Sequence, residues 1–145
     1  MNIYVASSWK NQRQPLVVAL LREWGHDAYD FRNPKPGDKG FNWGWLGPKH
    51  LSPESWAPHE YLELLEDATV EGAFRDDFNA MEWAEVCVLV LPCGRSAHFE
   101  AGWFAGKGKP VIGLLEQDRV DPEIMHKMMY LVQNVESLRN TLREL

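Results

Sequence analysis

Hydrophobic positions in the first part of the chain alternate between two periods. Residues 2–6 read NIYVA, a short apolar run that ends in two serines, and this pattern predicts a strand. Apolar residues at helical spacing follow between residues 11 and 24, and Gly25 is the expected helix stop. Residues 26–31 predict a second strand. A strand, a helix and a strand in this order form a βαβ unit, so we expect two parallel strands.

The same alternation returns after residue 58. Residues 86–91 are apolar throughout, as in a central parallel strand that is covered on both faces. The other expected elements are helices over 59–68, 70–84, 96–107, 121–128 and 135–145, and strands over 110–115 and 129–134. Together they predict a three-layer α/β sandwich, flavodoxin-like or Rossmann-like, with a five-stranded parallel sheet in the order 2-1-3-4-5.

An insert at about residues 32–58 follows neither period. It is rich in proline, glycine and aromatic residues, including Trp43. Solvated linkers contain few aromatic residues, so the insert is either a lid, a binding loop or an oligomer contact, or its rings cap the domain core. We expect residues 1–145 to form a single domain that includes this insert.

The chain is acidic, with a formal net charge of −6 and no cluster of basic residues. This charge argues against duplex nucleic acid as a partner, although a small phosphorylated ligand needs only one or two cations. Because no stretch is apolar enough for a membrane span and no signal pattern precedes the first strand, we expect a cytoplasmic protein. Cys87 and Cys93 belong to no Cys/His cluster at ligand spacing, so we expect neither a metal nor another cofactor.

The predicted strand order also places a ligand site. Ligands of open parallel sheets bind beyond the carboxyl ends of the strands where the strand order reverses, here between the first and third strands. The loops at this point are Ser7–Lys10 and Pro92–Ser96. Gly94, Arg95 and Ser96 precede a predicted helix, and free N–H groups, a guanidinium and a hydroxyl suit a phosphate. The plain alternative for Arg95 is an exposed loop arginine.

Glu100 is the candidate for chemistry at this edge. If Ser96 caps the helix, Glu100 lies in the first turn, one residue beyond the capping-box position. An acid that is stabilised by the helix dipole is the plain alternative. A glutamate that borders a cleft would instead be a nucleophile, or would stabilise an oxocarbenium-like transition state at the anomeric carbon of a sugar. Its neighbours indicate a helix packed closely on the sheet, which favours this second interpretation; they are Phe99, Ala101, Gly102 and Trp103.

Other polar residues near this edge each have a plain alternative. Ser7 and Ser8 would face the same cleft, but serines are also ordinary turn residues. We interpret His98 as an ordinary surface or half-buried histidine. Asp76 and Asp77 lie on the helix that leads into the third strand, from which one of them would reach the cleft, although an aspartate on a helix is usually solvated.

Three blocks of the sequence together resemble the nucleoside 2-deoxyribosyltransferase superfamily, which includes nucleoside 5′-monophosphate N-glycosidases. The blocks are IYVASSW, RDDFNAMEWAEVCVLVLP and EAGWFAGKGKPVIGLL. The resemblance spans most of residues 2–115 and is most specific in the pattern E-A-G-x-x-A-G-x-G-K-P. Glu85 stands where the family often has an aspartate.

The resemblance implies a parallel α/β fold, a homo-oligomer and cleavage of the N-glycosidic bond of a small-molecule nucleotide or nucleoside. By position, Glu100 matches the nucleophile of the family, and Asp77 matches the acid that assists the base or orients the sugar. Where the family's transferase branch keeps an acidic residue after the third strand, this chain has Cys-Gly-Arg-Ser, which favours a phosphorylated substrate. The predicted substrate-binding residues are Ser7, Ser8, Trp9, Trp43, Gly94, Arg95 and Ser96.

The main hypothesis is therefore an N-glycoside hydrolase or an N-(deoxy)ribosyltransferase. Two alternatives stay open. One is a module of the same fold that binds a nucleotide without turning it over, and the other is an interaction protein whose tryptophan-rich insert docks a partner.

Overall fold

The computed structural model describes residues 1–46 and 56–145, which form two compact units. One unit consists of Met1–Asp30 and Ala80–Leu145, and the other of Phe31–Asn79. The second unit contains the described part of the predicted insert, of which residues 47–55 lie outside the described residues. Among the described residues, no helix has the length and apolar character that a membrane crossing requires.

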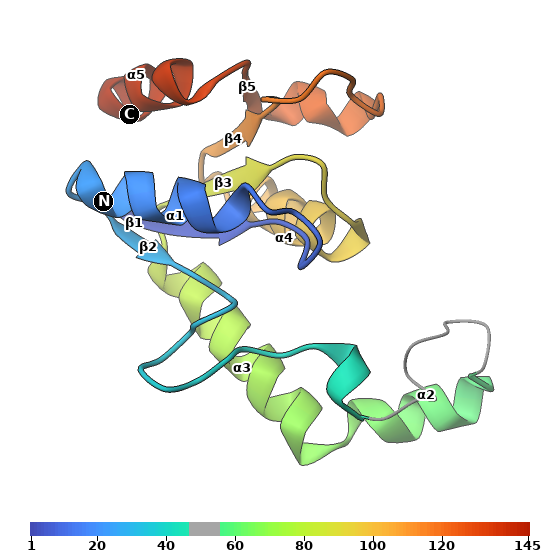
Figure 1. Cartoon of the computed structure of the whole chain (residues 1–145). Coiled ribbons are helices and arrows are strands. Elements are labelled where there is room, and N and C mark those ends of the chain that lie inside the picture. The colour runs from blue at the N-terminus through green and yellow to red at the C-terminus, as the bar shows by residue number, and fades with distance from the viewer. Residues whose placement is uncertain (47–55) are drawn as a thin grey trace. The chain divides into compact units, whose positions relative to one another are not determined.

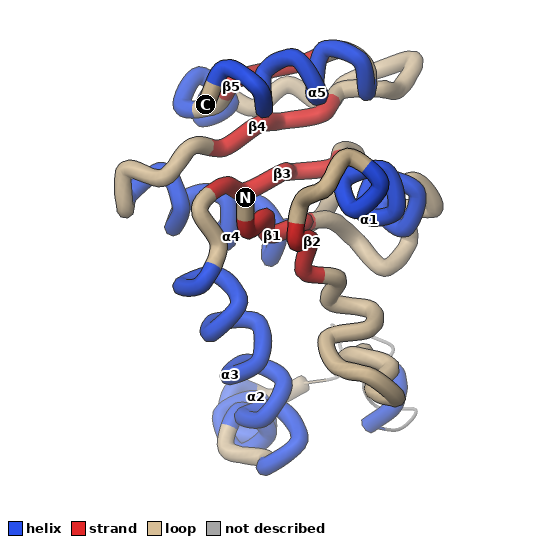
Figure 2. Tube along the Cα trace, turned by 90° about the vertical axis from the view of Figure 1, so that its left-hand side faces the viewer, coloured by secondary structure: helices blue, strands red, loops and turns tan. Residues whose placement is uncertain are grey.

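The first unit is built on a five-stranded parallel sheet in the order β2-β1-β3-β4-β5, as the sequence predicts (Figure 1). Figure 2 shows the strands following one another across the sheet in this order. The central register pairs Val5 with Val88 and Val88 with Ile112. The strands are β1 (Asn2–Ala6), β2 (Asp27–Tyr29), β3 (Val86–Val90), β4 (Val111–Leu114) and β5 (Tyr130–Val132).

Helices cover both faces of this sheet, and successive residues of β3 show how. Val88 packs with Val18 of α1 (Gln14–Glu23) and Leu138 of α5 (Val135–Glu144). Leu89 packs instead with Phe104 of α4 (Arg95–Gly106). Because neighbouring side chains of a strand point to opposite faces, α1 and α5 lie on one face and α4 lies on the other. The result is the three-layer α/β sandwich that the sequence predicts.

The predicted helix over residues 121–128 differs from the observed element. The structure has a short 3-10 helix, η4 (Ile124–Met128), so Pro122 precedes the helix and does not occupy its first position. The carboxylate of Glu123 caps η4 by accepting a hydrogen bond from the Met125 backbone N–H at 3.1 Å. Such short helices are common as connectors, and this one links β4 to β5.

The second unit contains η1 (Trp43–Leu46), α2 (Pro58–Leu65) and most of α3 (Ala68–Trp83). The helical spacing of Phe74, Phe78 and Met81, with Trp83 as a further candidate, predicts an apolar stripe along α3, and this prediction is only partly correct. Met81 is buried, but the side chains of Phe74 and Trp83 are 60% and 45% exposed. Phe74 stacks on Phe78 within the second unit, with ring centroids 5.6 Å apart.

Candidate functional site

Two loops at the carboxyl edge of the sheet are joined by side-chain hydrogen bonds. The Ser7 hydroxyl donates to the Val90 carbonyl at 2.8 Å. The side-chain amide of Asn11 donates to the carbonyls of Val90 and Pro92 at 3.2 and 3.1 Å, and Asn11 is only 6% exposed. The loops after β1 and β3 therefore lie side by side at the point where the strand order reverses. Sequence reasoning missed Asn11, because an asparagine before a helix resembles an ordinary turn residue.

The N-cap of α4 lies two residues earlier than the sequence predicts. Gly94 is the N-cap, with an extended backbone, and Ser96 is the second residue of the helix. The expectation that Ser96 is the cap is wrong, and so is the placement of Glu100 in the first turn, which contains no acidic residue. Both plain explanations of Glu100, the capping box and the helix dipole, therefore fail, because each acts only within the first turn.

Glu100 lies at the border of the face that α4 presents to the sheet. Ala97, Ala101 and Phe104 are buried at the four- and three-residue spacing of one helix face. Glu100 comes three residues after Ala97 and four before Phe104, so it flanks this face, and it is half-buried. The expectation that Phe99 and its neighbours are packed on the sheet is wrong in part, because Ala101 is buried but Phe99 is 82% exposed.

The charge of Glu100 acts on two thiols of the loop and the sheet. Burial, followed by the negative charge of Glu100, raises the pKa of Cys93 to about 12. The same two causes raise the pKa of the fully buried Cys87 well above its usual range, while a hydrogen bond with the backbone of Ala6 lowers it. Cys87 belongs to β3 and Ala6 ends β1. The carboxylate of Glu100 therefore acts on both thiols, of which Cys93 lies in the loop at the carboxyl end of β3.

The other predicted residues of the first unit lie on the two joined loops. Gly94, Arg95 and Ser96 are exposed at the start of α4, where helix geometry leaves the first backbone N–H groups without partners in the helix. Ser8 is half-buried, and its hydroxyl oxygen accepts a hydrogen bond from the Lys10 N–H at 3.2 Å. Trp9 is half-buried on the same loop.

Two predicted site residues, Asp77 and Trp43, belong to the second unit. Asp77 is half-buried on α3, and its neighbour Asp76 forms an ion pair with Lys35 at 2.5 Å. Trp43 is 40% exposed and packs edge-on against Phe41, with ring centroids 5.1 Å apart. The structure thus brings together the seven predicted residues of the first unit, and the other two belong to the second unit.

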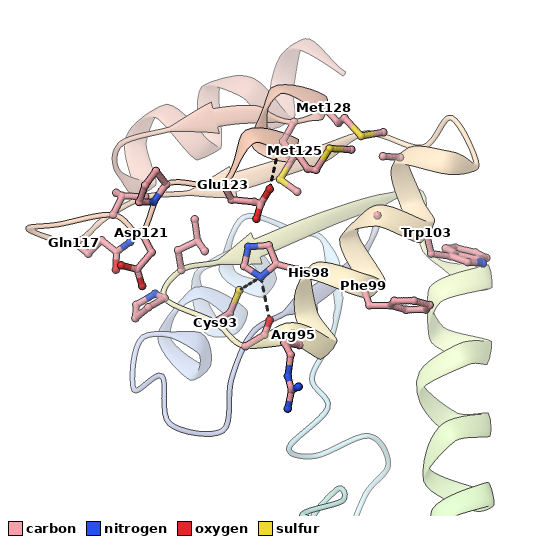
Figure 3. A pocket seen from close by; sticks show the side chains of 18 of the residues that line it. Cys93, Arg95, His98, Phe99, Trp103, Gln117, Asp121, Glu123, Met125 and Met128 are labelled. Carbon is pink, nitrogen blue, oxygen red and sulfur yellow. Dashed lines mark hydrogen bonds between the residues drawn. The ribbon is translucent and has the colours of Figure 1, made fainter. Parts of the chain in front are cut away.

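A pocket of about 1100 Å³ borders α4 (Figure 3), and the residues that line it include His98 and Phe99 but not Glu100. Sequence reasoning did not predict it, because its walls come from α4 and from the segment between β4 and β5. Gly102 faces this pocket, where an added Cβ would meet no atom within 4 Å, so it is not a contact with the sheet. The lining includes Leu91, Phe99, Trp103, Gln117, Met125 and Met128.

His98 is the polar centre of this pocket and has three contacts. Its Nδ1 lies 3.0 Å from the carbonyl oxygen of Gly94 and 3.4 Å from the sulfur of Cys93. Its Nε2 lies 3.1 Å from Nε2 of His126, which is 6% exposed. Sequence reasoning missed His126, since 28 residues separate it from His98. The described residues contain no group of three metal-ligating side chains.

Comparison with known proteins supports the fold. No family model and no curated protein matches the sequence. Among solved structures, the chain is similar to a 2-deoxyribosyltransferase from the psychrotolerant bacterium Bacillus psychrosaccharolyticus, with a TM-score of 0.62 and 18% sequence identity. The match covers 95% of this chain and 90% of the other. The two chains share a fold. The resemblance seen in the sequence is thus supported at the level of a distant relationship to this fold.

Proposed function

We propose that this protein cleaves the N-glycosidic bond of a nucleotide or nucleoside, as an N-glycoside hydrolase or an N-(deoxy)ribosyltransferase. The observation that carries the proposal is the position of Glu100. Its charge acts on Cys93, in the loop at the carboxyl end of β3 where ligands of open parallel sheets bind, and no capping function accounts for it. The fold shared with a 2-deoxyribosyltransferase supports the same reaction class.

In the proposed reaction, a carboxylate oxygen of Glu100 attacks the anomeric carbon, or stabilises positive charge there, while the bond to the base breaks. The electron pair of that bond leaves with the base, which takes up a proton. Asp77 is the proposed source of this proton, or the group that orients the sugar. Water then releases the sugar in a hydrolase, and a second base does so in a transferase.

A phosphorylated substrate fits the joined loops better than a free nucleoside. The start of α4 offers exposed backbone N–H groups, the Ser96 hydroxyl and the Arg95 guanidinium. Helix N-termini and guanidinium groups bind phosphate through charge-assisted hydrogen bonds. We therefore assign the 5′-phosphate to the Gly94–Ser96 turn, with Ser7 and Ser8 on the adjacent loop. Trp9 and Trp43 are the proposed contacts to the sugar or the base.

A substrate panel tests this proposal. The protein is incubated with nucleosides, 5′-monophosphates and NAD, and free base is followed by chromatography. We expect base release from at least one 5′-monophosphate, and faster release than from the matching nucleoside. Binding of a monophosphate by calorimetry without release of base from any compound would contradict the proposal and favour a nucleotide-binding module.

We also propose that the protein is a homo-oligomer. Phe99 and Ile124 are 82% and 79% exposed, and contact with a second copy would remove such side chains from water. Sedimentation equilibrium gives the mass directly, and a monomer of 16.7 kDa at every concentration would contradict this assignment.

A further inference from the structure

His98 and His126 point at each other along one line. Their Nε2 atoms are 3.1 Å apart, the rings are within 15° of coplanar, and the ring centroids are 5.4 Å apart. The centroid separation exceeds the nitrogen separation by about one ring diameter, which requires both nitrogens to lie on the line between the centroids. This is the geometry of a single N–H···N hydrogen bond. The two nitrogens point at each other and not at a common third point, so they are not arranged as two ligands of one metal ion.

The protons of this pair can be assigned from their partners. The carbonyl oxygen of Gly94 only accepts hydrogen bonds, so His98 Nδ1 carries a hydrogen and donates it to Gly94. Cys93, whose pKa is raised to about 12, is a neutral thiol at physiological pH and adds a weak contact to the same nitrogen. A neutral His98 therefore has its lone pair on Nε2, and His126 donates to it. The chain of donors runs from His126 through His98 to Gly94.

This series of hydrogen bonds ends at Gly94, which is the N-cap of α4. The Gly94 carbonyl also accepts the backbone N–H of His98 at 3.4 Å, so one side chain supports the peptide that begins the helix. His126 is held by η4, which Glu123 caps. The pair therefore fixes the turn that offers the Arg95 and Ser96 N–H groups.

We propose that His98 and His126 form a proton-linked relay that positions the Gly94–Ser96 turn for an anion. His98 and His126 are positioning residues and not catalytic ones. The inference rests on the proposed function only in taking this turn as the phosphate site.

Two successive protons have opposite effects on the hydrogen bond between His98 and His126. The first added proton leaves one N–H between the rings and places a positive charge near the turn. The second gives both Nε2 atoms a hydrogen, so two cationic N–H groups face each other and the bond breaks. Burial, and then the charge of His98, lower the pKa of His126, whereas Glu123 raises it, so this second step belongs to the acid range. The other charged or titratable groups that line this pocket are Cys93, Arg95, Arg119 and Asp121.

Sulfate binding tests the relay without requiring turnover. Sulfate keeps its double charge between pH 4.5 and pH 8, whereas the second pKa of a phosphate ester is about 6 and would confuse the result. In the wild-type protein, we expect sulfate affinity to rise as the pH falls, reach a maximum and then decrease. In His126→Phe the repulsion between the two rings is absent, so affinity should rise steadily as the pH falls.

Two further variants separate the relay from a general loss of structure. At pH 7.5, His126→Phe should bind sulfate roughly 2- to 10-fold more weakly, the range of one net hydrogen bond. His126→Gln keeps a donor for His98 and should restore the wild-type affinity. His26→Gln is the matched control, because His26 also has a pKa that is lowered by burial but precedes β2 at the opposite edge of the sheet, and it should keep the maximum.

Long-range proton–nitrogen NMR adds a direct readout of the tautomer. We expect His98 to carry its neutral-state hydrogen on Nδ1. A hydrogen on His98 Nε2, or the same steady rise of sulfate affinity in the wild type and in His126→Phe, would overturn the relay. If no nucleotide is cleaved but sulfate binding shows the maximum, the proposed function fails and the relay stands. If base is released but the maximum is missing, the relay alone fails.

Discussion

Burial, and then the negative charge of Glu100 on α4, raise the pKa of the Cys93 thiol in the loop after β3. The negative charge of a side chain on α4 therefore acts on a thiol at the carboxyl end of the central strand, β3. This relationship places Glu100 without reference to any substrate, and it makes Cys93 a chemical reporter of the proposed site.

The reactivity of Cys93 gives the first prediction. Because the thiolate is the reactive form and the pKa is about 12, alkylation by iodoacetamide at pH 8.5 should be much slower than for a free thiol. Glu100→Gln removes the second cause of the raised pKa but leaves burial, so alkylation should become faster without reaching the rate of a free thiol. Mass spectrometry of the modified peptide measures both rates, and Cys93→Ser shows the background from Cys87. An unchanged rate in Glu100→Gln would contradict the placement of Glu100.

Alkaline stability gives the second prediction. A thiol whose pKa is higher in the folded than in the unfolded state contributes stability that is complete below the unfolded value of 9.0 and is lost as the pH rises toward the folded value. The free energy of unfolding should therefore fall between pH 9.0 and about 12. Urea titrations at several pH values should show a shallower fall for Cys93→Ala. Equal slopes for the two proteins would show that Cys93 titrates normally.

The buried amide of Asn11 gives the third prediction. Asn11→Ala leaves the carbonyls of Val90 and Pro92 without this donor, so the free energy of unfolding should fall by about 1–3 kcal/mol. Asn140→Ala, on the exposed surface of α5, is the control and should cost nothing. Urea denaturation measures both, and a loss as small as that of the control would mean that Asn11 does not hold the two loops.

Lys109 gives the fourth prediction and explains part of the sequence resemblance. Its ammonium donates to the carbonyls of Met81, Glu82 and Ala84 at 3.1, 2.9 and 2.6 Å, at the end of α3. Lys109→Met keeps the length of the side chain but removes the donors, and we expect a loss of about 1–3 kcal/mol by urea denaturation. Lys127→Met, an exposed substitution on η4, should lie within about 0.5 kcal/mol of the wild type. Equal changes in the free energy of unfolding of the two variants would show that the hydrogen bonds of Lys109 do not stabilise the fold.

Sequence patterns were sufficient for the sheet because they depend on local periodicity and chain connectivity. The apolar run at β3 and the βαβ order fixed the strand sequence, and the order 2-1-3-4-5 then placed the two joined loops. Gly25, with a φ of 87°, ends α1 as predicted. Lys109, the second lysine of the GKGKP segment, donates hydrogen bonds at the end of α3. That part of the resemblance therefore reflects the fold and not the chemistry.

The site was less predictable because its details depend on side-chain contacts between distant segments. A serine is a better N-cap than most residues, so Ser96 was expected to be the N-cap of α4, whereas Gly94 is. This difference of two residues moved Glu100 out of the first turn. His126 has no local signal, and its bond with His98 forms only when η4 packs beside α4. The exposed Phe99 likewise has the same apolar character as a core residue in the sequence.

The most direct test of the account is the rate of base release by Glu100→Gln. The substitution keeps the shape of the side chain and removes its charge. With the best 5′-monophosphate of the panel, the rate should fall by at least about 100-fold, as for residues that take part in the chemical step, while the dissociation constant changes little. Glu136→Gln, on the exposed surface of α5, is the matched control and should keep the full rate. A Glu100→Gln protein that releases base as fast as this control would contradict the central claim.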